Sequence, residues 1–219
     1  SLIDDLQSLT VQNSPPLFIS VDQEGGRVAR LKEPFTQFPP MCCLGEANSD
    51  DLAYRFGIAM GKEMKAVGIN MDYSPVLDVH SNPENPIIGK RAISSNPEVV
   101  ARLGCKIIQG FKDAGTFPVG KHFPGHGDTS QDSHLTLPRV ERSKESLEKM
   151  ELVPFSQAFQ KGLEIIMTAH VVYPAWDENS AATFSKYILN DILRKKMTFQ
   201  GLVMSDDLEM QAVTQTPEE

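Results

Sequence analysis

The sequence predicts an α/β protein built as a (β/α)8 barrel of the TIM type. Short apolar runs alternate with stretches in which apolar residues recur at helical spacing, a pattern typical of parallel strands covered by helices. Polar residues follow the carboxyl ends of several apolar runs. In a barrel those ends meet at one mouth, whereas a doubly wound open sheet, the alternative, spreads them along a crevice. We therefore favour the barrel.

The expected elements alternate in order along the chain. A strand is expected where an apolar run ends in a glycine or a polar residue, and a helix where apolar positions recur every three or four residues. The clearest helix is 96–115. It has Asn96 as its N-cap, Pro97 in its first turn and Gly115 at its end. The full series is strand 17–26, helix 51–68, strand 69–79, helix 96–115, strand 117–123, helix 143–162, strand 165–170, helix 185–197 and strand 201–207.

About five strands are visible in this pattern, fewer than a closed barrel needs. A complete barrel of this type occupies about 250 residues, and this chain has 219. We expect at least one strand before Leu17 and two after Asp206 to be missing, so that residues 1–219 form a single, partial catalytic barrel domain. A barrel that does not close would expose strand edges.

Composition excludes several classes of partner. The formal net charge is −8, and there is no basic stripe with interleaved aromatic residues, so nucleic acid is not expected as a partner. No apolar run approaches the roughly 18 residues of a membrane helix. The chain has three cysteines, an odd number without zinc-type spacing. Reduced thiols and a cytoplasmic location are expected.

The segment KHFPGHGDTSQDSH, residues 121–134, allows three further interpretations besides proton transfer. His122 and His126 have the spacing of a helical zinc pair, but Pro124 and the glycines demand a turn and no HExxH motif is present. A phosphate site would need a glycine-rich turn that leads into a helix, and here a polar loop follows. A purely structural loop is the third alternative. We expect neither a metal nor a cofactor.

Proton transfer is the interpretation we favour for this segment. Asp132 and His134 lie two residues apart, so on an extended loop both face one side. A carboxylate beside an imidazole fixes its tautomer and makes it a better acid near neutral pH. Asp206, at the end of the last expected strand, is a candidate nucleophile toward an electrophilic carbon. The alternative for Asp206 or Asp207 is a helix N-cap.

Four motifs occur in order between about Leu17 and Met210: VDQEGGRVARL, MDYSPVLDV, KHFPGHGDTSQDSH and SDDLEM. Together they resemble glycoside hydrolase family 3, specifically its bacterial β-N-acetylglucosaminidase branch. The resemblance implies a (β/α)8 barrel and a retaining mechanism through a covalent glycosyl-enzyme intermediate. It also implies a small carbohydrate substrate, because cytosolic members of the family cleave N-acetylglucosamine from cell-wall muropeptides.

The resemblance also implies roles for individual residues. Asp206 would be the nucleophile, and His134, paired with Asp132, would be the general acid/base in place of the customary second carboxylate. His126 is interpreted as part of the loop structure, and the role of His170 is left open. The residues implied to bind the sugar or the loop around it are Asp22, Arg30, Arg91, Lys121 and His122.

Other functions stay open at this point. A β-glucosidase or a phosphorylase of the same family is the first alternative, and a non-catalytic carbohydrate-binding relative is the second. The loop with Asp132 and His134 argues against the glucosidase branch, which takes its acid from a separate domain. The presence of Asp206 beside that pair argues against a mere binder. Water and phosphate as acceptors are not distinguished.

Overall fold

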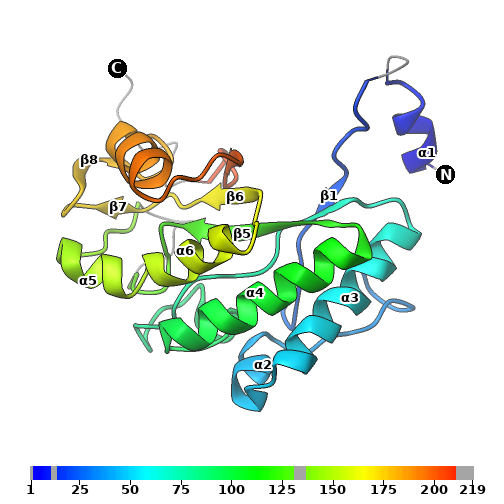
Figure 1. The fold of residues 1–219 in the computed structure, drawn as a ribbon, viewed down its shortest axis with the longest axis horizontal. Coiled ribbons are helices and arrows are strands. Elements are labelled where there is room, and N and C mark those ends of the chain that lie inside the picture. Colours follow the sequence, from blue (N-terminus) through cyan, green and yellow to red (C-terminus); the bar gives the residue numbers. More distant parts are fainter. Residues whose placement is uncertain (1, 11–13, 131–136, 211–219) are drawn as a thin grey trace.

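A five-stranded parallel sheet forms the centre of the molecule, in a computed structural model that describes residues 2–10, 14–130 and 137–210. The strand order is β1-β4-β5-β6-β9, with β1, β5 and β6 labelled in Figure 1, and every neighbouring pair is parallel. The order follows the sequence without the reversal that a doubly wound sheet requires. The predicted barrel class is therefore confirmed, with five strands present. Their bounds are β1 Ser20–Val21, β4 Met71–Asp72, β5 Phe117–Phe123, β6 Ile165–Thr168 and β9 Leu202–Ser205.

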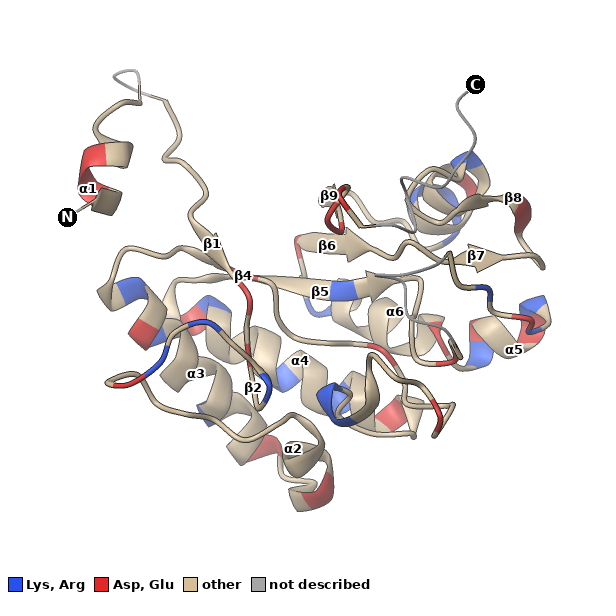
Figure 2. Cartoon of the chain, turned by 180° about the vertical axis from the view of Figure 1, so that it is seen from behind, with Lys and Arg blue, Asp and Glu red and all other residues tan. Residues whose placement is uncertain are grey.

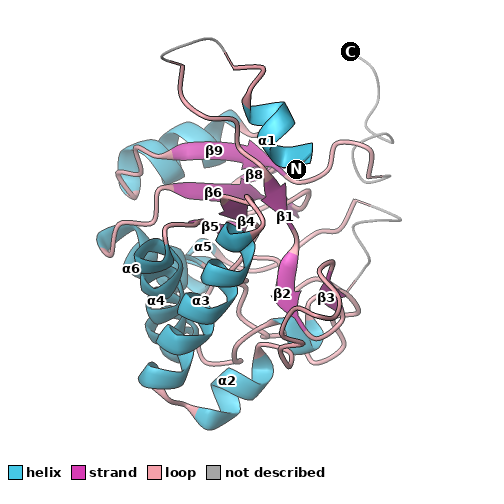
Figure 3. Ribbon diagram, turned by 90° about the vertical axis from the view of Figure 1, so that its right-hand side faces the viewer, coloured by secondary structure: helices cyan, strands magenta, loops and turns pink. Residues whose placement is uncertain are grey.

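Three helices, α3 (Asp50–Ala66), α4 (Pro97–Ala114) and α6 (Leu152–Gln160), cover one side of this sheet (Figure 3). Helices α3 and α4 approach each other through glycine. A Cβ added at Gly57 would lie 2.3 Å from the backbone oxygen of Ile107, so a larger residue would force the two helices apart.

The predicted ends of the helix at 96–115 are confirmed. The Asn96 side chain accepts a hydrogen bond from the backbone N–H of Glu98 at 2.9 Å, which satisfies one of the amide groups left unpaired at a helix start. Pro97 lies in the first turn. Gly115 ends the helix with a φ of 79°, in the left-handed region that glycine enters without strain.

Several predicted elements differ from those observed. The strand expected at 17–26 is short, because Gly25 and Gly26 have φ angles of +93° and +60° and turn the chain back into the hairpin of β2 (Gln23–Gly25) and β3 (Val28–Ala29). The strand expected at 69–79 is reduced to β4.

The helix expected at 143–162 is in fact two helices, α5 (Lys144–Lys149) and α6, separated at Met150 and Glu151. The break turns the Glu151 side chain into the interior, where it is 0% exposed. The helix expected at 185–197 is present as η2 (Tyr187–Lys196), with the wider winding of a π-helix. Elements that the sequence did not indicate are α1 (Leu2–Gln7), α2 (Cys42–Ala47), η1 (Gly89–Arg91), β7 (Val172–Tyr173) and β8 (Asp177–Ala181).

The charged residues and the cysteines are distributed as follows. Acidic and basic positions are interspersed along the helices and loops in the view of Figure 2. Cys42, Cys43 and Cys105 are free cysteines. Within residues 2–10, 14–130 and 137–210, none of the helices has the length and apolar character needed to cross a membrane.

Candidate functional site

A cavity of about 380 Å³ lies at the carboxyl ends of the strands. In barrels of this type the carboxyl end is the face that carries catalysis. A larger cavity, of about 550 Å³, lies between α6 and residues 196–201 at the amino end of β9, the face that in barrels serves stability. The smaller cavity is lined by Asp22, Arg27, Val28, Arg30, Ile87, Arg91, Lys121, His122, His126 and Asp206.

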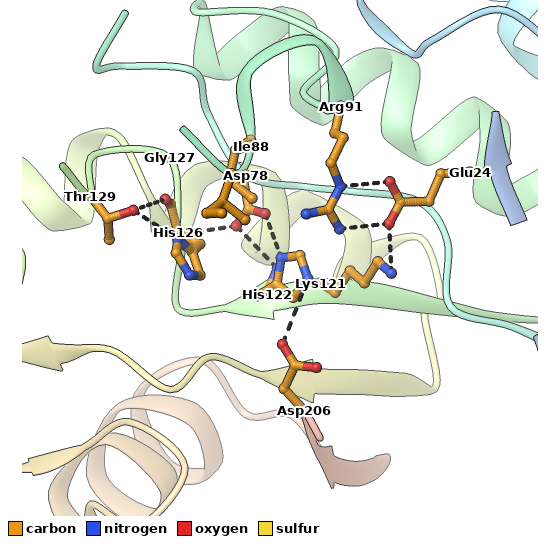
Figure 4. Close-up of polar contacts among 12 residues, drawn as sticks. Glu24, Asp78, Ile88, Arg91, Lys121, His122, His126, Gly127, Thr129 and Asp206 are labelled. Carbon is orange, nitrogen blue, oxygen red and sulfur yellow. Dashed lines mark hydrogen bonds and ion pairs between the residues drawn. The ribbon is translucent and has the colours of Figure 1, made fainter. Parts of the chain in front are cut away.

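Lys121 and Arg91 line one side of the cavity and contact the buried Glu24 behind them (Figure 4). Lys121, near the end of β5, places its Nζ 2.8 Å from Asp22 Oδ1 and 2.7 Å from Glu24 Oε1. Arg91 donates to both oxygens of Glu24, from Nε at 2.8 Å and from Nη2 at 2.7 Å. A bidentate pair of this kind fixes the orientation of the guanidinium as well as its position.

The charges in this group stabilise each other. Burial alone would raise the pKa of Glu24, but Lys121 and Arg91 lower it to about 2. Burial would lower the pKa of Lys121, yet Glu24 and Asp22 raise it above its ordinary value. Both groups are therefore charged at neutral pH, although each is at most 2% exposed.

A buried histidine pair with a carboxylate forms the floor. Asp78 Oδ2 lies 2.7 Å from His122 Nδ1, so Nδ1 carries the hydrogen and Nε2 is directed toward Asp206, at 4.0 Å from Oδ2. The other oxygen of Asp78 accepts the backbone N–H groups of His122, at 3.0 Å, and of His126, at 2.7 Å. Burial raises the pKa of Asp78, but His122 and His126 lower it to about 2.

Asp206 lies directly after β9 and faces this cavity. Its backbone N–H donates to the carbonyl of Thr168 at 3.2 Å, and the N–H of Asp207 donates to its Oδ1 at 2.8 Å. Burial would raise the pKa of Asp206, but His122, the Asp207 amide and Lys121 hold it below its ordinary value. Asp206 is thus an ionised carboxylate beside an open volume, with its side chain 24% exposed.

The loop after β5 packs tightly against the loop after β4. A Cβ at Gly127 would lie 1.6 Å from the backbone oxygen of Val79, so only glycine fits there. His126 Nδ1 lies 2.9 Å from Thr129 Oγ1, as expected for a structural loop residue, but the side chain also lines the cavity. Burial and the neighbouring His122 lower the pKa of His126 to about 4, so its imidazole is neutral at pH 7.

The remaining sequence candidates are distributed as follows. Asp132 and His134 lie outside the described residues. His170 follows β6, but it bonds to Thr183 and to the carbonyl of Asp207 and does not line the cavity. The described residues contain no group of three or more His, Cys, Asp or Glu side chains arranged to hold a metal ion. The candidates that the structure does bring together are Asp22, Arg30, Arg91, Lys121, His122 and Asp206.

Three participants were missed by the sequence-based assignment: Glu24, Asp78 and Arg27. Glu24 is within the VDQEGG motif and Asp78 within the MDYSPVLDV motif, but neither was given a role. A signal was available, since an acidic residue at the end of an apolar run is costly to bury and needs a partner. The partners themselves come from distant parts of the chain and carry no local signal.

The carboxyl ends of the parallel strands thus carry an ionised carboxylate and a cluster of polar donors, the face at which enzymes of the barrel class hold their active sites. The chain matches the family described as the glycosyl hydrolase family 3 N terminal domain over residues 2–218. It therefore belongs to glycosyl hydrolase family 3, and the resemblance noted in the motifs is confirmed.

Individual relatives agree with this membership. A β-hexosaminidase of Nitrosomonas eutropha is 43% identical over 211 residues, which cover 94% of this chain and 60% of that protein. A family 3 β-N-acetylglucosaminidase from a Paenibacillus species superposes with a TM-score of 0.90 at 45% identity, covering 92% of this chain and 39% of the other.

NagZ from Neisseria gonorrhoeae, solved in complex with N-trifluoroacetyl-D-glucosamine, superposes with a TM-score of 0.88 at 40% identity, covering 95% of this chain and 62% of the other. The chain thus spans about 60% or less of the length of the relatives named here.

Proposed function

We propose that the protein acts as a retaining exo-β-N-acetylglucosaminidase, which removes terminal β-linked N-acetylglucosamine from peptidoglycan-derived muropeptides. The observation that carries this proposal is the ionised Asp206 at the edge of a cavity whose other wall offers N–H donors from Arg91 and Lys121. An oxocarbenium-like transition state requires an anion beneath the anomeric carbon. The β-hexosaminidase names of the relatives support the same activity.

The proposed reaction has two steps. Asp206 attacks the anomeric carbon and forms a glycosyl-aspartate bond, while the glycosidic carbon–oxygen bond breaks and the leaving oxygen takes a proton from His134. Water then attacks the same carbon and gives its proton to His134, and the bond to Asp206 breaks. In this proposal Asp132 orients the imidazole of His134. Asp22, Arg30, Arg91, Lys121 and His122 bind the sugar.

No metal or cofactor is needed for these steps, because the carboxylate supplies the nucleophile and the imidazole supplies the proton. We further place the protein in the cytoplasm, where muropeptides are recycled and where its free cysteines would stay reduced. Cell fractionation that recovers the protein outside the cytoplasm would contradict this location.

Replacement of Asp206 tests the proposal. Asp206→Ala should lower the turnover of an aryl β-N-acetylglucosaminide by at least about 10³-fold, because the nucleophile is lost. The matched control is Asp191→Ala, whose side chain lies in an exposed pair with Lys195. A 2-fluoro sugar should trap a covalent adduct on Asp206 in the unmodified protein. Turnover of Asp206→Ala equal to that of the control, with a native circular dichroism spectrum, would exclude Asp206 as the nucleophile.

The role of His134 has a separate signature. His134→Ala should slow substrates with poor leaving groups more than activated aryl glycosides, since only the poor leaving groups require a proton. Equal slowing of both would show that His134 is not the acid.

A further inference from the structure

Glu24 is a buried carboxylate that holds two cations of the cavity without lining the cavity itself. Its side chain is 1% exposed. Lys121 and Arg91, which do line the cavity, reach it with Nζ at 2.7 Å and with a bidentate pair at 2.7 and 2.8 Å (Figure 4). The carboxylate therefore contacts the groups that face a ligand but not the ligand.

The arrangement balances charge within a few ångströms. Lys121 has a second carboxylate partner, Asp22, at 2.8 Å, so the buried Lys121 and the partly buried Arg91 face two carboxylates. Arg27 and Arg30 also line the cavity, but both are exposed, and water and salt weaken the field of exposed charges. The inner wall formed by Lys121 and Arg91 consequently has little net charge.

Donor groups remain after these pairs have formed. An ammonium has three N–H donors and a guanidinium has five. The Lys121 ammonium is paired with two carboxylates and Arg91 with one. The remaining N–H groups can donate to hydroxyl or carbonyl oxygens of a neutral sugar. An anionic sugar would meet the same donors without an excess positive charge to offset its desolvation.

We propose that Glu24 is a positioning residue that determines specificity: it orients Arg91 and Lys121 and cancels their charge, so that the cavity selects an uncharged hexosamine over an anionic sugar. This inference rests on the function proposed above and names the charge class of the sugar accepted at that site. The low net charge of the wall depends on four side chains together, and Glu24 is the carboxylate that contacts both cations. The four are Asp22, Glu24, Arg91 and Lys121.

The test compares two sugars that differ in one group, N-acetylglucosamine and N-acetylglucosaminuronic acid, by calorimetric titration. The unmodified protein should bind the neutral sugar at least about tenfold more tightly. Glu24→Gln keeps the size of the side chain but leaves one cation uncompensated, so it should shift the affinity ratio toward the acid by about tenfold, the size expected when a neighbouring unit charge is lost. In turnover of the aryl glycoside, Glu24→Gln should raise KM rather than lower kcat.

Glu178→Gln is the matched control, because Glu178 is exposed and distant in sequence from the cavity residues, and it should keep the original ratio. Asp22→Asn removes the other partner of Lys121 and should shift the ratio in the same direction, which keeps the inference testable if Glu24→Gln does not fold. Equal affinity of the unmodified protein for both sugars, or a folded Glu24→Gln with an unchanged ratio, would overturn the inference. Failure of the unmodified protein to bind either sugar would instead contradict the proposed function, and this inference with it.

Discussion

Glu24 and Glu151 are both buried glutamates, and their environments make them chemically opposite. Their exposed fractions are 1% and 0%. Two cations contact Glu24 and bring its pKa to about 2 against the effect of burial. Burial raises the pKa of Glu151 to about 8, and the charges of Asp78 and Asp128 add to the rise. One side chain is an anion at neutral pH and the other retains a proton.

The polar contacts of Glu151 explain this difference. Its Oε1 accepts from Ser81 Oγ at 3.4 Å, while Oε2 has no hydrogen-bond partner among the described residues. Arg142 is the nearby cation that lowers the pKa, but its Nε and Nη2 donate to Asp128 at 2.6 and 2.7 Å. Burial raises the free energy of an ionised side chain, and neighbouring charges and hydrogen-bond donors decide whether that increase is offset.

The two glutamates also serve different parts of the fold. Glu24 supports the wall of the cavity. Glu151 lies beneath the loop after β5, where its Oε2 would be 2.7 Å from a Cβ at Gly125, and Tyr173 donates its hydroxyl to the carbonyl of Gly125. This loop also carries His126, whose backbone N–H donates to Asp78 Oδ1.

The first expected effect follows from removing a cation that neutralises Glu24. Lys121→Met should lower the free energy of unfolding by about 3–5 kcal/mol at pH 7, because it leaves the buried Glu24 with Arg91 as its remaining cation. Lys195→Met is the control, since the Lys195–Asp191 pair is exposed, and it should cost less than about 1 kcal/mol. Urea denaturation measures both. Equal losses would mean that Arg91 alone compensates Glu24.

The next effect concerns Glu151 and pH. Between pH 4.5 and about 8 the folded protein keeps a proton on Glu151 that the unfolded chain has released. The contribution of this group to stability is complete below pH 4.5 and falls by about 1.4 kcal/mol per pH unit up to about pH 8. Glu151→Gln should remove this pH dependence. The free energy of unfolding of the variant should therefore fall less between pH 5 and pH 8 than that of the unmodified protein.

Urea denaturation from pH 5 to pH 8 measures the slope, with Glu178→Gln as the exposed glutamate control. A slope in Glu151→Gln identical to that of the unmodified protein would show that Glu151 is ionised in the folded state, like Glu24.

The smallest effect is expected from replacing Asp128, an anionic neighbour of Glu151. Asp128→Asn removes one anion and releases Arg142 from its pair, and both changes favour the ionised form of Glu151. The pH at which the stability stops falling should move below 8, by about one unit or less. Asp191→Asn, in an exposed pair, should leave that pH unchanged. An upward shift in Asp128→Asn would indicate that Arg142 acts on Glu151 only through Asp128.

Helix ends show how far local sequence predicts this fold. The helix α4 begins and ends as predicted, because its cap at Asn96 and its left-handed glycine at Gly115 involve only neighbouring residues. The predicted helix at 143–162 is broken. Pro154 in the first turn of α6 explains the break, because proline has no N–H to bond to the carbonyl of Met150 and its ring would clash with that carbonyl. The apolar spacing alone did not reveal this, and the contacts of Glu151 come from other loops.

The candidate site likewise contains residues that local sequence predicts and residues that only tertiary contacts bring in. Asp206 was predicted from its position at a strand end, since parallel strands bring those ends to one face of the sheet, and Asp22 and Lys121 were implied by the motifs that resemble the family. Glu24 pairs with Arg91, which lies 67 residues away in the chain, and no local pattern predicts that contact. From the sequence His126 was interpreted only as part of the loop. In the structure it also lines the cavity, next to Gly127, which packs closely on Val79.

By itself the sequence determined the alternation of strands and helices, the caps of α4, the family and the residue types available at the strand ends. These features depend on neighbouring residues or on recurring motifs. Only the tertiary structure decided which buried carboxylates are charged, because ionisation inside a protein depends on the distance to other charges. The difference between Glu24 and Glu151 is therefore a property of the fold, and it is not visible in either residue's sequence neighbours.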